Sequence, residues 1–403
     1  MRTAGSFDAL RERQFRLFYI GQTVSLLGDG MLPVALAFAV LGLTGSASDL
    51  GIVLTARSIP LVVLLLAGGV VADRLPRRAV MVATDLVRLA TQAASGVLLV
   101  TGSAHVWQLA VLQAAYGSAT AFYYPASTGL TPLVVSAPRL QQANALRGLS
   151  QAAGGVAGPA IAGVLVAGVG TGWALLADAA SFGVSALFLA QLQLPARERV
   201  RVQPFLRDLR EGWREFTART WVWVVVVAAS AGNMLNAAYR VLGPLVAKQS
   251  LGGAGAWAAI SAGFGVGSVA GGVIALRSSP RRPLLFAGLW GSFFGAPMLL
   301  LAAVAPTPAI VASAVLSGGS LMIFNTLWET TLQQEIPDRA LSRVTAYDWF
   351  GSVAFEPVGL AIVGPIAVGL GVSTTLWLAG ALMLTTTLAI LAVPSVRRFE
   401  SGR

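Results

Sequence analysis

Two stretches of this chain decide its fold. The first reads Gly68-Gly69-Val70-Val71-Ala72-Asp73-Arg74-Leu75-Pro76-Arg77-Arg78, and the second reads Gly271-Gly272-Val273-Ile274-Ala275-Leu276-Arg277-Ser278-Ser279-Pro280-Arg281-Arg282. Each is a glycine pair near the end of an apolar run, followed by a short turn rich in arginine. A chain that repeats its own helix-turn-helix unit within an apolar background is typical of two-part membrane transporters.

The composition excludes an ordinary soluble protein. Of the 403 residues, 56% are hydrophobic and 11% are charged, whereas about a quarter are charged in soluble domains. The net charge of +11 does not indicate nucleic-acid binding, because the arginines lie in short loops between apolar runs and are better explained by orientation in a lipid bilayer. The chain has no cysteine and a single histidine, His105, so we expect neither a metal site nor a cofactor.

Apolar runs of spanning length predict an all-α membrane protein with twelve transmembrane helices in two six-helix, pseudo-symmetric halves. A membrane helix needs about 20 apolar residues, and each run meets this length. The predicted spans are 16–42, 50–72, 79–101, 105–126, 145–168, 172–194, 221–246, 254–276, 283–305, 308–328, 346–369 and 372–394.

The arginines predict the topology. They fall before the first span and in alternate loops, whereas the opposite loops offer only Lys248. The positive-inside rule therefore places both termini in the cytoplasm of a multi-pass protein of the inner or plasma membrane. The expected parts are a cytoplasmic N-terminus (1–15), a six-helix bundle (16–194), a cytoplasmic linker (195–220), a second bundle (221–394) and a cytoplasmic C-terminus (395–403).

Several motifs resemble the major facilitator superfamily over essentially the whole chain. A gate motif resembles the family signature between helices two and three, with Pro76 where glycine is usual; its residues are Gly69, Asp73, Arg74, Arg77 and Arg78. A helix-five motif resembles that of the drug:proton antiporters; its residues are Gly154, Gly158, Pro159 and Gly163. Further residues resemble the macrolide-efflux and enterobactin-exporter-like branch, among them Phe15-Arg16, Gly28-Asp29 and Leu332-Gln333-Gln334.

The resemblance implies roles for both motifs. The gate motif would form a charge latch that holds the cytoplasmic side shut; the alternative is that its arginines only set the topology. The helix-five glycines make a smooth face for close helix packing, with or without a role in transport. One departure is Gln113, which stands where the antiporters often carry an arginine in helix four, so no proton-relay role of that arginine is transferred.

Charged residues inside the predicted spans are the main site candidates, because such charges are costly in lipid and usually functional or paired. Asp29 and Arg57 fall at similar depth on adjacent spans, so Asp29 is a candidate proton-coupling carboxylate with Arg57 as its charge partner. Glu356 is a second proton-coupling candidate, because its repeat counterpart is Gly155. Arg240 is a further charge partner, as an anion contact or a counter-ion to Asp29. A structural ion pair remains the alternative to a coupling role.

Aromatic residues in the spans are candidates for lining a substrate cavity: Tyr116, Tyr123, Tyr124, Trp328, Trp349 and Phe355. No nucleotide-binding motif or catalytic cluster is found, so the sequence predicts a secondary transporter rather than an enzyme, with energy from an ion gradient. The favoured function is proton-coupled export of an amphipathic small organic molecule such as a drug, antibiotic or secondary metabolite, by a monomer with alternating access. A substrate:proton symporter or uniporter that imports a metabolite, and a transport-inactive membrane sensor or partner, remain open.

Overall fold

The computed structural model describes residues 8–194, 213–278 and 280–400, apart from the side chains of 66, 67, 69, 70, 72, 73, 338–340, 342 and 343. Within this part of the chain every regular element is a helix, which confirms the predicted all-α class. The chain divides into two compact units, Met1–Arg199 and Val200–Arg403. Residues 195–212 of the predicted linker lie outside the described residues.

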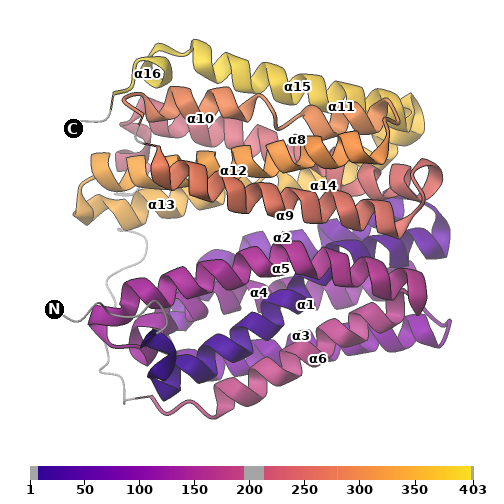
Figure 1. The fold of residues 1–403 in the computed structure, drawn as a ribbon, viewed down its shortest axis with the longest axis horizontal. Helices are drawn as coiled ribbons and strands as arrows, with labels where there is room; N and C mark the ends of the chain where they lie inside the picture. Colours follow the sequence, from indigo (N-terminus) through magenta and orange to yellow (C-terminus); the bar gives the residue numbers. More distant parts are fainter. Residues whose placement is uncertain (1–7, 195–212, 279, 401–403) are drawn as a thin grey trace. The chain divides into compact units, whose positions relative to one another are not determined.

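The described part of the first unit contains six long helices (Figure 1). They are α1 (Arg13–Thr44), α2 (Ala47–Arg74), α3 (Arg77–Val100), α4 (Val106–Val134), α5 (Leu140–Gly168) and α6 (Thr171–Ala190). Two 3-10 turns, η1 (Asp8–Arg11) and η2 (Ala137–Arg139), precede α1 and α5. The helices α4 and α5 extend beyond the predicted spans 105–126 and 145–168, because a helix continues past the apolar run into polar sequence.

The described part of the second unit repeats this series with two interruptions. Its elements are α8 (Thr220–Ser250), α9 (Ala254–Arg277), α10 (Pro283–Gly291), α11 (Ala296–Ala302), α12 (Thr307–Glu335), α13 (Asp338–Val353), α14 (Glu356–Leu370), α15 (Val372–Ala392) and α16 (Pro394–Arg397). The spans predicted at 283–305 and 346–369 are present as apolar stretches long enough to cross a membrane, but a turn interrupts each of them, after Gly291 and after Val353. Pro297 and Pro357 stand in the first turns of α11 and α14, where the missing proline N–H has no helical partner to lose. Proline alone does not cause the breaks, because Pro33 and Pro159 lie inside the continuous helices α1 and α5.

The helices pack in the same pattern in both units. In the first unit α1 packs on α5 and α6, α2 packs on α4, and α3 packs on α4 and α6. In the second unit α8 packs on α13, α14 and α15, α9 packs on α12, and the α10–α11 pair packs on α12 and α15. The broken pairs therefore replace single helices of the first unit, and the predicted pseudo-symmetric halves are confirmed.

Glycines at equivalent positions make the close helix contacts. On α5, an added Cβ at Gly158 would lie 2.5 Å from the backbone of Gly30 on α1. On α14, an added Cβ at Gly359 would lie 2.3 Å from the carbonyl oxygen of Met234 on α8. Small residues allow helix backbones to approach closely in lipid, where apolar side chains alone give no association. The glycine spacing in the sequence thus corresponds to the α1–α5 contact and to the equivalent α8–α14 contact in the second unit.

Helix α3 is polar on its buried face and apolar on its exposed face. Asp85 and Arg88 are 0% and 1% exposed, whereas Leu86 and Val97 are 52% and 51% exposed. A helix surrounded by lipid requires this inverted arrangement, since the surrounding solvent is hydrocarbon. In the described residues ten stretches are long and apolar enough to cross a membrane; α3 and α4 are not among them, because each turns a row of polar residues inward.

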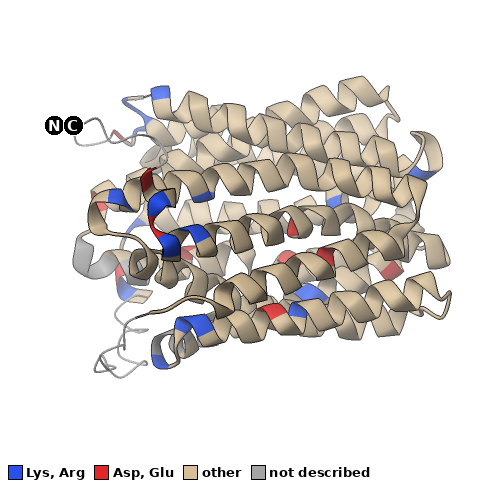
Figure 2. Cartoon of the chain, turned by 60° about the horizontal axis from the view of Figure 1, so that its bottom comes forward, with Lys and Arg blue, Asp and Glu red and all other residues tan. Residues whose placement is uncertain are grey.

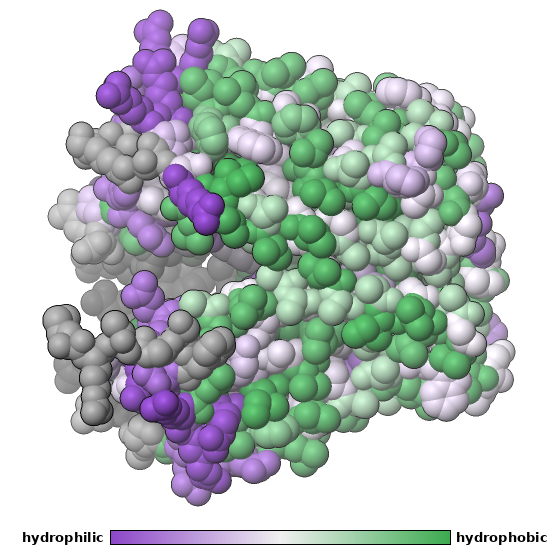
Figure 3. All heavy atoms as spheres, in the orientation of Figure 1, coloured by the Kyte–Doolittle hydropathy of each residue, from purple (hydrophilic) through white to green (hydrophobic). Residues whose placement is uncertain are grey.

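Charged residues gather at the helix ends, and few lie along the helices (Figure 2). The visible surface is apolar over most of the helix length and polar at the ends (Figure 3). These are the surfaces expected of helices embedded in a bilayer.

Gly158→Val is expected to lower the stability of the protein by about 1–3 kcal/mol, because the added carbons collide with the backbone of Gly30. Gly155→Val is the matched control on the same helix, because nothing lies within 4 Å of a Cβ at Gly155. The measurement is thermal unfolding of the purified protein in detergent. Equal losses in the two variants would show that the close contact does not determine the packing of α5.

A carboxylate outside the membrane ties the start of α1 to the turn before α5. Oε1 of Glu12 accepts hydrogen bonds from Ser136 Oγ at 2.6 Å and from Arg139 Nη1 at 2.9 Å, and Oε2 accepts one from the Ser136 backbone N–H at 2.9 Å. Partial burial raises the pKa of Glu12, but these donors outweigh it and hold the pKa below its ordinary value of 4.5. The ionised carboxylate is therefore the form that stabilises this junction.

Glu12→Gln is expected to destabilise the protein at pH 7 by less than about 1 kcal/mol, since the site is partly solvated. Because the folded pKa is depressed, the contribution of Glu12 is present above pH 4.5 and disappears as the pH falls through the folded pKa. Unfolding temperatures of both proteins should therefore converge between pH 7 and pH 3. A difference that stays constant over this range would contradict the ionic origin of the contact.

Candidate functional site

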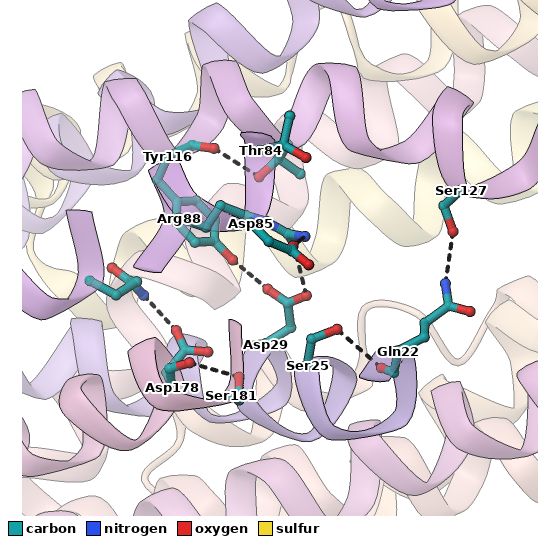
Figure 4. Close-up of polar contacts among 12 residues, drawn as sticks. Gln22, Ser25, Asp29, Thr84, Asp85, Arg88, Tyr116, Ser127, Asp178 and Ser181 are labelled. Atoms are coloured by element: carbon teal, nitrogen blue, oxygen red, sulfur yellow. Dashed lines mark hydrogen bonds and ion pairs between the residues drawn. The ribbon is translucent and has the colours of Figure 1, made fainter. Parts of the chain in front are cut away.

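A buried cluster of charges lies inside the first unit (Figure 4). Arg88 on α3 donates from Nη2 to Asp85 Oδ1, and its Nη1 lies 3.5 Å from Oδ2 of Asp29 on α1. The side chains of Arg88 and Asp85 are 1% and 0% exposed, whereas that of Asp29 is 27% exposed. One arginine thus bridges a fully buried carboxylate and a partly exposed one.

The geometry of α3 explains how this cluster forms. Asp85, Arg88 and Gln92 are spaced by three and four residues, which places them on one face of a helix. The guanidinium of Arg88 also lies 3.8 Å from the ring centre of Tyr123 and 4.3 Å from that of Phe182. Aromatic faces stabilise a desolvated cation, so the rings from α4 and α6 complete the environment of Arg88.

Asp29 has a second partner on α4. The hydroxyl of Tyr116 donates to Asp29 Oδ1, and the guanidinium of Arg57 lies 4.8 Å from the centre of the Tyr116 ring. The structure therefore differs from the predicted pairing of Asp29 with Arg57. The arginine that contacts Asp29 is Arg88, and Arg57 reaches the cluster through the aromatic ring between them.

A second chain of polar side chains lies near the cluster and reaches α6. Gln113 Nε2 donates to Gln92 Oε1 at 2.9 Å, and Gln92 Nε2 donates to Asp178 Oδ2 at 2.6 Å. Gln113, at the position of the expected helix-four arginine, is thus one link in this network. A Cβ at Gly28 would lie 2.6 Å from Asp178 Oδ1, so the glycine before Asp29 makes room for the second carboxylate.

A second arginine of the first unit is held by neutral groups. Arg147 on α5 donates to Gln22 Oε1 at 2.9 Å, to Thr131 Oγ1 at 2.6 Å and to Ser127 Oγ at 3.2 Å. Arg147 is not among the candidate site residues predicted from the sequence. The available signal was its position eight residues after the polar turn, on the continuation of the helix that carries the glycine motif.

The second unit brings two predicted residues together. Arg240 on α8 forms an ion pair with Glu356, the first residue of α14. The partial positive charge of a helix N-terminus adds to the stabilisation of the Glu356 carboxylate. Among the described residues, no three His, Asp or Glu side chains gather in a way that would hold a metal ion.

The second unit also contains a cavity of about 520 Å³. It lies among α8, α10, α12, α13 and α15, and two of the predicted aromatics, Trp328 and Trp349, line it. Two acids that are not among the candidates of the sequence analysis, Glu329 and Asp348, line it as well. Both lie near the ends of predicted spans, where charge is less costly, yet α12 continues to Glu335 and α13 begins at Asp338, so both acids lie on helices.

The comparisons with known proteins agree with this architecture. The family model described as Major Facilitator Superfamily matches residues 18–352. The chain belongs to the major facilitator superfamily. The enterobactin exporter EntS of Shigella boydii serotype 18 is 28% identical, with 96% of this chain and 93% of that protein covered. EntS of Escherichia coli O139:H28 is 27% identical over the same shares.

Solved structures show the same fold at low sequence identity. The nucleoside transporter NupG has a TM-score of 0.73 and 13% identity, with 96% of this chain and 100% of that chain covered. A POT family transporter in complex with 5-aminolevulinic acid has a TM-score of 0.73 and 10% identity, with 94% and 96% covered. This major facilitator protein is therefore a multi-pass membrane protein of a transporter family.

The gate motif of this major facilitator protein is described only in part. Gly69 and the side chain of Asp73 lie outside the described set, and Arg74 is exposed at the end of α2. Arg77 donates to the carbonyl of Gly129 on α4, and Arg78 donates to the carbonyl of Ala190, the last residue of α6. Both arginines therefore bind carbonyl oxygens within their own unit and fasten the start of α3 to α4 and α6.

The other aromatic candidates are divided between core and surface. Tyr116 and Tyr123 are buried in the charge cluster, at 0% and 5% exposure. Tyr124 and Phe355 are exposed, at 54% and 57%, and neither lines the cavity of the second unit.

Arg88→Gln is expected to destabilise the protein by about 3–5 kcal/mol, because it leaves the Asp85 carboxylate buried without its cation. The double variant Asp85→Asn/Arg88→Gln should recover much of this loss, since both charges are then absent. Thermal unfolding in detergent measures the stability of the single and the double variant. Arg281→Gln, which changes an exposed loop arginine, is the control. If the double variant is no more stable than Arg88→Gln, the loss does not come from the uncompensated charge of Asp85.

Proposed function

We propose that this protein exports an amphipathic small organic molecule across the cell membrane in exchange for protons. The family and the relatives named enterobactin exporters support transport out of the cell. The observation that carries the proton coupling is the unequal exposure of the three carboxylates in the first unit. Asp29 is 27% exposed, whereas Asp85 and Asp178 are 0% exposed, so Asp29 is the acid that exchanges protons with solvent.

Protonation of Asp29 changes contacts between three helices. The ionised carboxylate on α1 attracts Arg88 on α3 and accepts from Tyr116 on α4. A proton on Asp29 removes the attraction to Arg88, which then keeps Asp85 as its carboxylate partner. The contacts of α1 with α3 and α4 weaken when the proton binds, and this links proton binding to helix movement.

Glu356 is the second proposed coupling site. Its ion pair with Arg240 ties α8 to α14, the pair equivalent to α1 and α5. The side chains of Glu356 and Arg240 are 20% and 38% exposed, so this pair is also not fully buried. Protonation of Glu356 releases Arg240, which becomes available to an anionic group.

The proposed working unit is a monomer of the inner or plasma membrane with both termini in the cytoplasm. The expected halves are residues 16–194 and 221–394, joined by the linker 195–220. They alternate between inward-open and outward-open states by rocking, and the gate motif acts as the cytoplasmic latch. The distribution of arginines supports the cytoplasmic placement of the termini, and the internal repeat supports alternation between two halves.

The function is tested in liposomes that contain the purified protein and a pH-sensitive dye. We expect substrate-dependent proton flux with at least one compound of a panel made of enterobactin, ethidium and chloramphenicol. Asp29→Asn or Glu356→Gln should abolish the flux, because a neutral amide cannot exchange a proton. Glu400→Gln is the matched control, since Glu400 pairs with the exposed Arg282 outside the helices that span the membrane.

The outcomes separate the alternatives. Compound movement without proton flux would overturn the coupling mechanism while keeping transport. Accumulation of a compound inside intact cells, without protection against toxic compounds, would indicate an importer. Saturable binding of compounds that never cross the bilayer would indicate a sensor.

A further inference from the structure

The cavity of the second unit has the size of a small-molecule site. Its volume of about 520 Å³ lies within the range of about 300–1,000 Å³ that is usual for ligand pockets. Its described lining residues all belong to the second unit. Apolar and aromatic side chains make up much of the lining, with a few polar groups among them, as in most binding sites.

The charge of this cavity is entirely negative among its described lining residues. Glu329 and Asp348 are its charged members, and no arginine or lysine of the described residues lines it. This is unexpected in a chain with 28 basic and 17 acidic residues. The two carboxylates also repel each other. Nothing that the structure describes in the cavity wall compensates two negative charges.

Asp348 is held in place without being neutralised. Asp348 as a whole is 8% exposed, and its Oδ2 accepts a hydrogen bond from Trp328 Nε1 at 3.1 Å. Neither Asp348 nor Glu329 forms an ion pair within the described part of the chain. An indole N–H orients a carboxylate but supplies no positive charge, so the site retains its capacity to bind a cation.

Aromatic rings complete a cation site. Trp328 and Trp349 line the cavity together with Phe294 and Phe324. The rings of Phe324 and Trp328 are stacked, with centres 6.3 Å apart. Aromatic faces attract organic cations, and they also bury the apolar body of an amphipathic compound.

The repeat shows that the fold does not require this acid. The alignment that places Leu140 on Leu341 and Gly158 on Gly359 also places Arg147 on Asp348. Arg147 is surrounded by the neutral oxygens of Gln22, Ser127 and Thr131. The same position in the two units thus carries opposite charges. The fold therefore does not require a carboxylate at this position, and we relate the charge of Asp348 to the cavity that it lines.

We propose that the cavity of the second unit binds organic cations, with Glu329 and Asp348 compensating the charge and Trp328 and Trp349 covering the apolar body. This assigns a substrate class to the transporter and rests on the proposed function. The exported molecule is then an amphipathic compound with an amine, quaternary ammonium or similar cationic centre.

The test compares two ions of the same shape and opposite charge. Saturable binding of radiolabelled tetraphenylphosphonium and tetraphenylborate to the purified full-length protein is measured by equilibrium dialysis. We expect the cation to bind at least tenfold more tightly than the anion. The double variant Glu329→Gln/Asp348→Asn should lose this preference, whereas Glu335→Gln, an acid of the same helix that does not line the cavity, should retain it.

Equal binding of both ions by the wild type, or a cation preference that survives in the double variant, would overturn the proposal. Circular dichroism and the unfolding temperature establish that the double variant is folded. The single variants Glu329→Gln and Asp348→Asn, each expected to weaken cation binding, keep the test decisive if the double variant does not fold.

Transport is measured separately in liposomes, so the two proposals fail independently. Specific cation binding without transport of any compound would support the site and overturn the exporter function. Transport of neutral or anionic compounds with no cation binding would support the exporter and overturn the site.

Discussion

Arg88 and Asp85 form an ion pair that is almost completely excluded from solvent, at 1% and 0% exposure. Charges in such a place are tolerated only when neighbouring groups compensate them, and here each neighbouring helix supplies one. Helix α1 provides Asp29, α4 provides the Tyr123 ring and α6 provides the Phe182 ring. The orientation of α3 follows from this requirement. Its polar face must point inward, and its leucines and valines therefore face outward.

The two units share a packing pattern but differ in charge. Glycines hold α1 against α5 and α8 against α14 at equivalent positions. On this common frame the first unit carries Arg88 between two carboxylates, with a third carboxylate nearby, whereas the second carries one ion pair and an acidic, aromatic cavity. The internal repeat accounts for the shared helix packing of the two units. Positions at which the two units carry different charged or polar residues indicate where ligands or protons bind. Asn233 stands where the first unit has Asp29, and Asp348 stands where it has Arg147.

Much of the fold was predictable because lipid restricts the possible structures. The apolar runs predicted the helices, and the spacing of Gly154 and Gly158 predicted a close helix contact that the structure places against Leu26 and Gly30 of α1. The breaks before α11 and α14 were missed, although Pro297 and Pro357 were visible in the sequence. Proline inside an apolar run is compatible with a kinked helix as well as with a break, and only the surrounding packing distinguishes them.

The sequence by itself determined that this is a helical membrane protein with an internal repeat, and it pointed to buried acids as the candidate site. It did not determine which acid meets which arginine. Asp29 was paired with Arg57 from depth alone, yet its contact is with Arg88, 59 residues away. Depth follows from counting residues along a helix, whereas the partner depends on how each helix is rotated about its own axis. That rotation is decided by the packing of all six helices of the unit, and therefore by the tertiary structure.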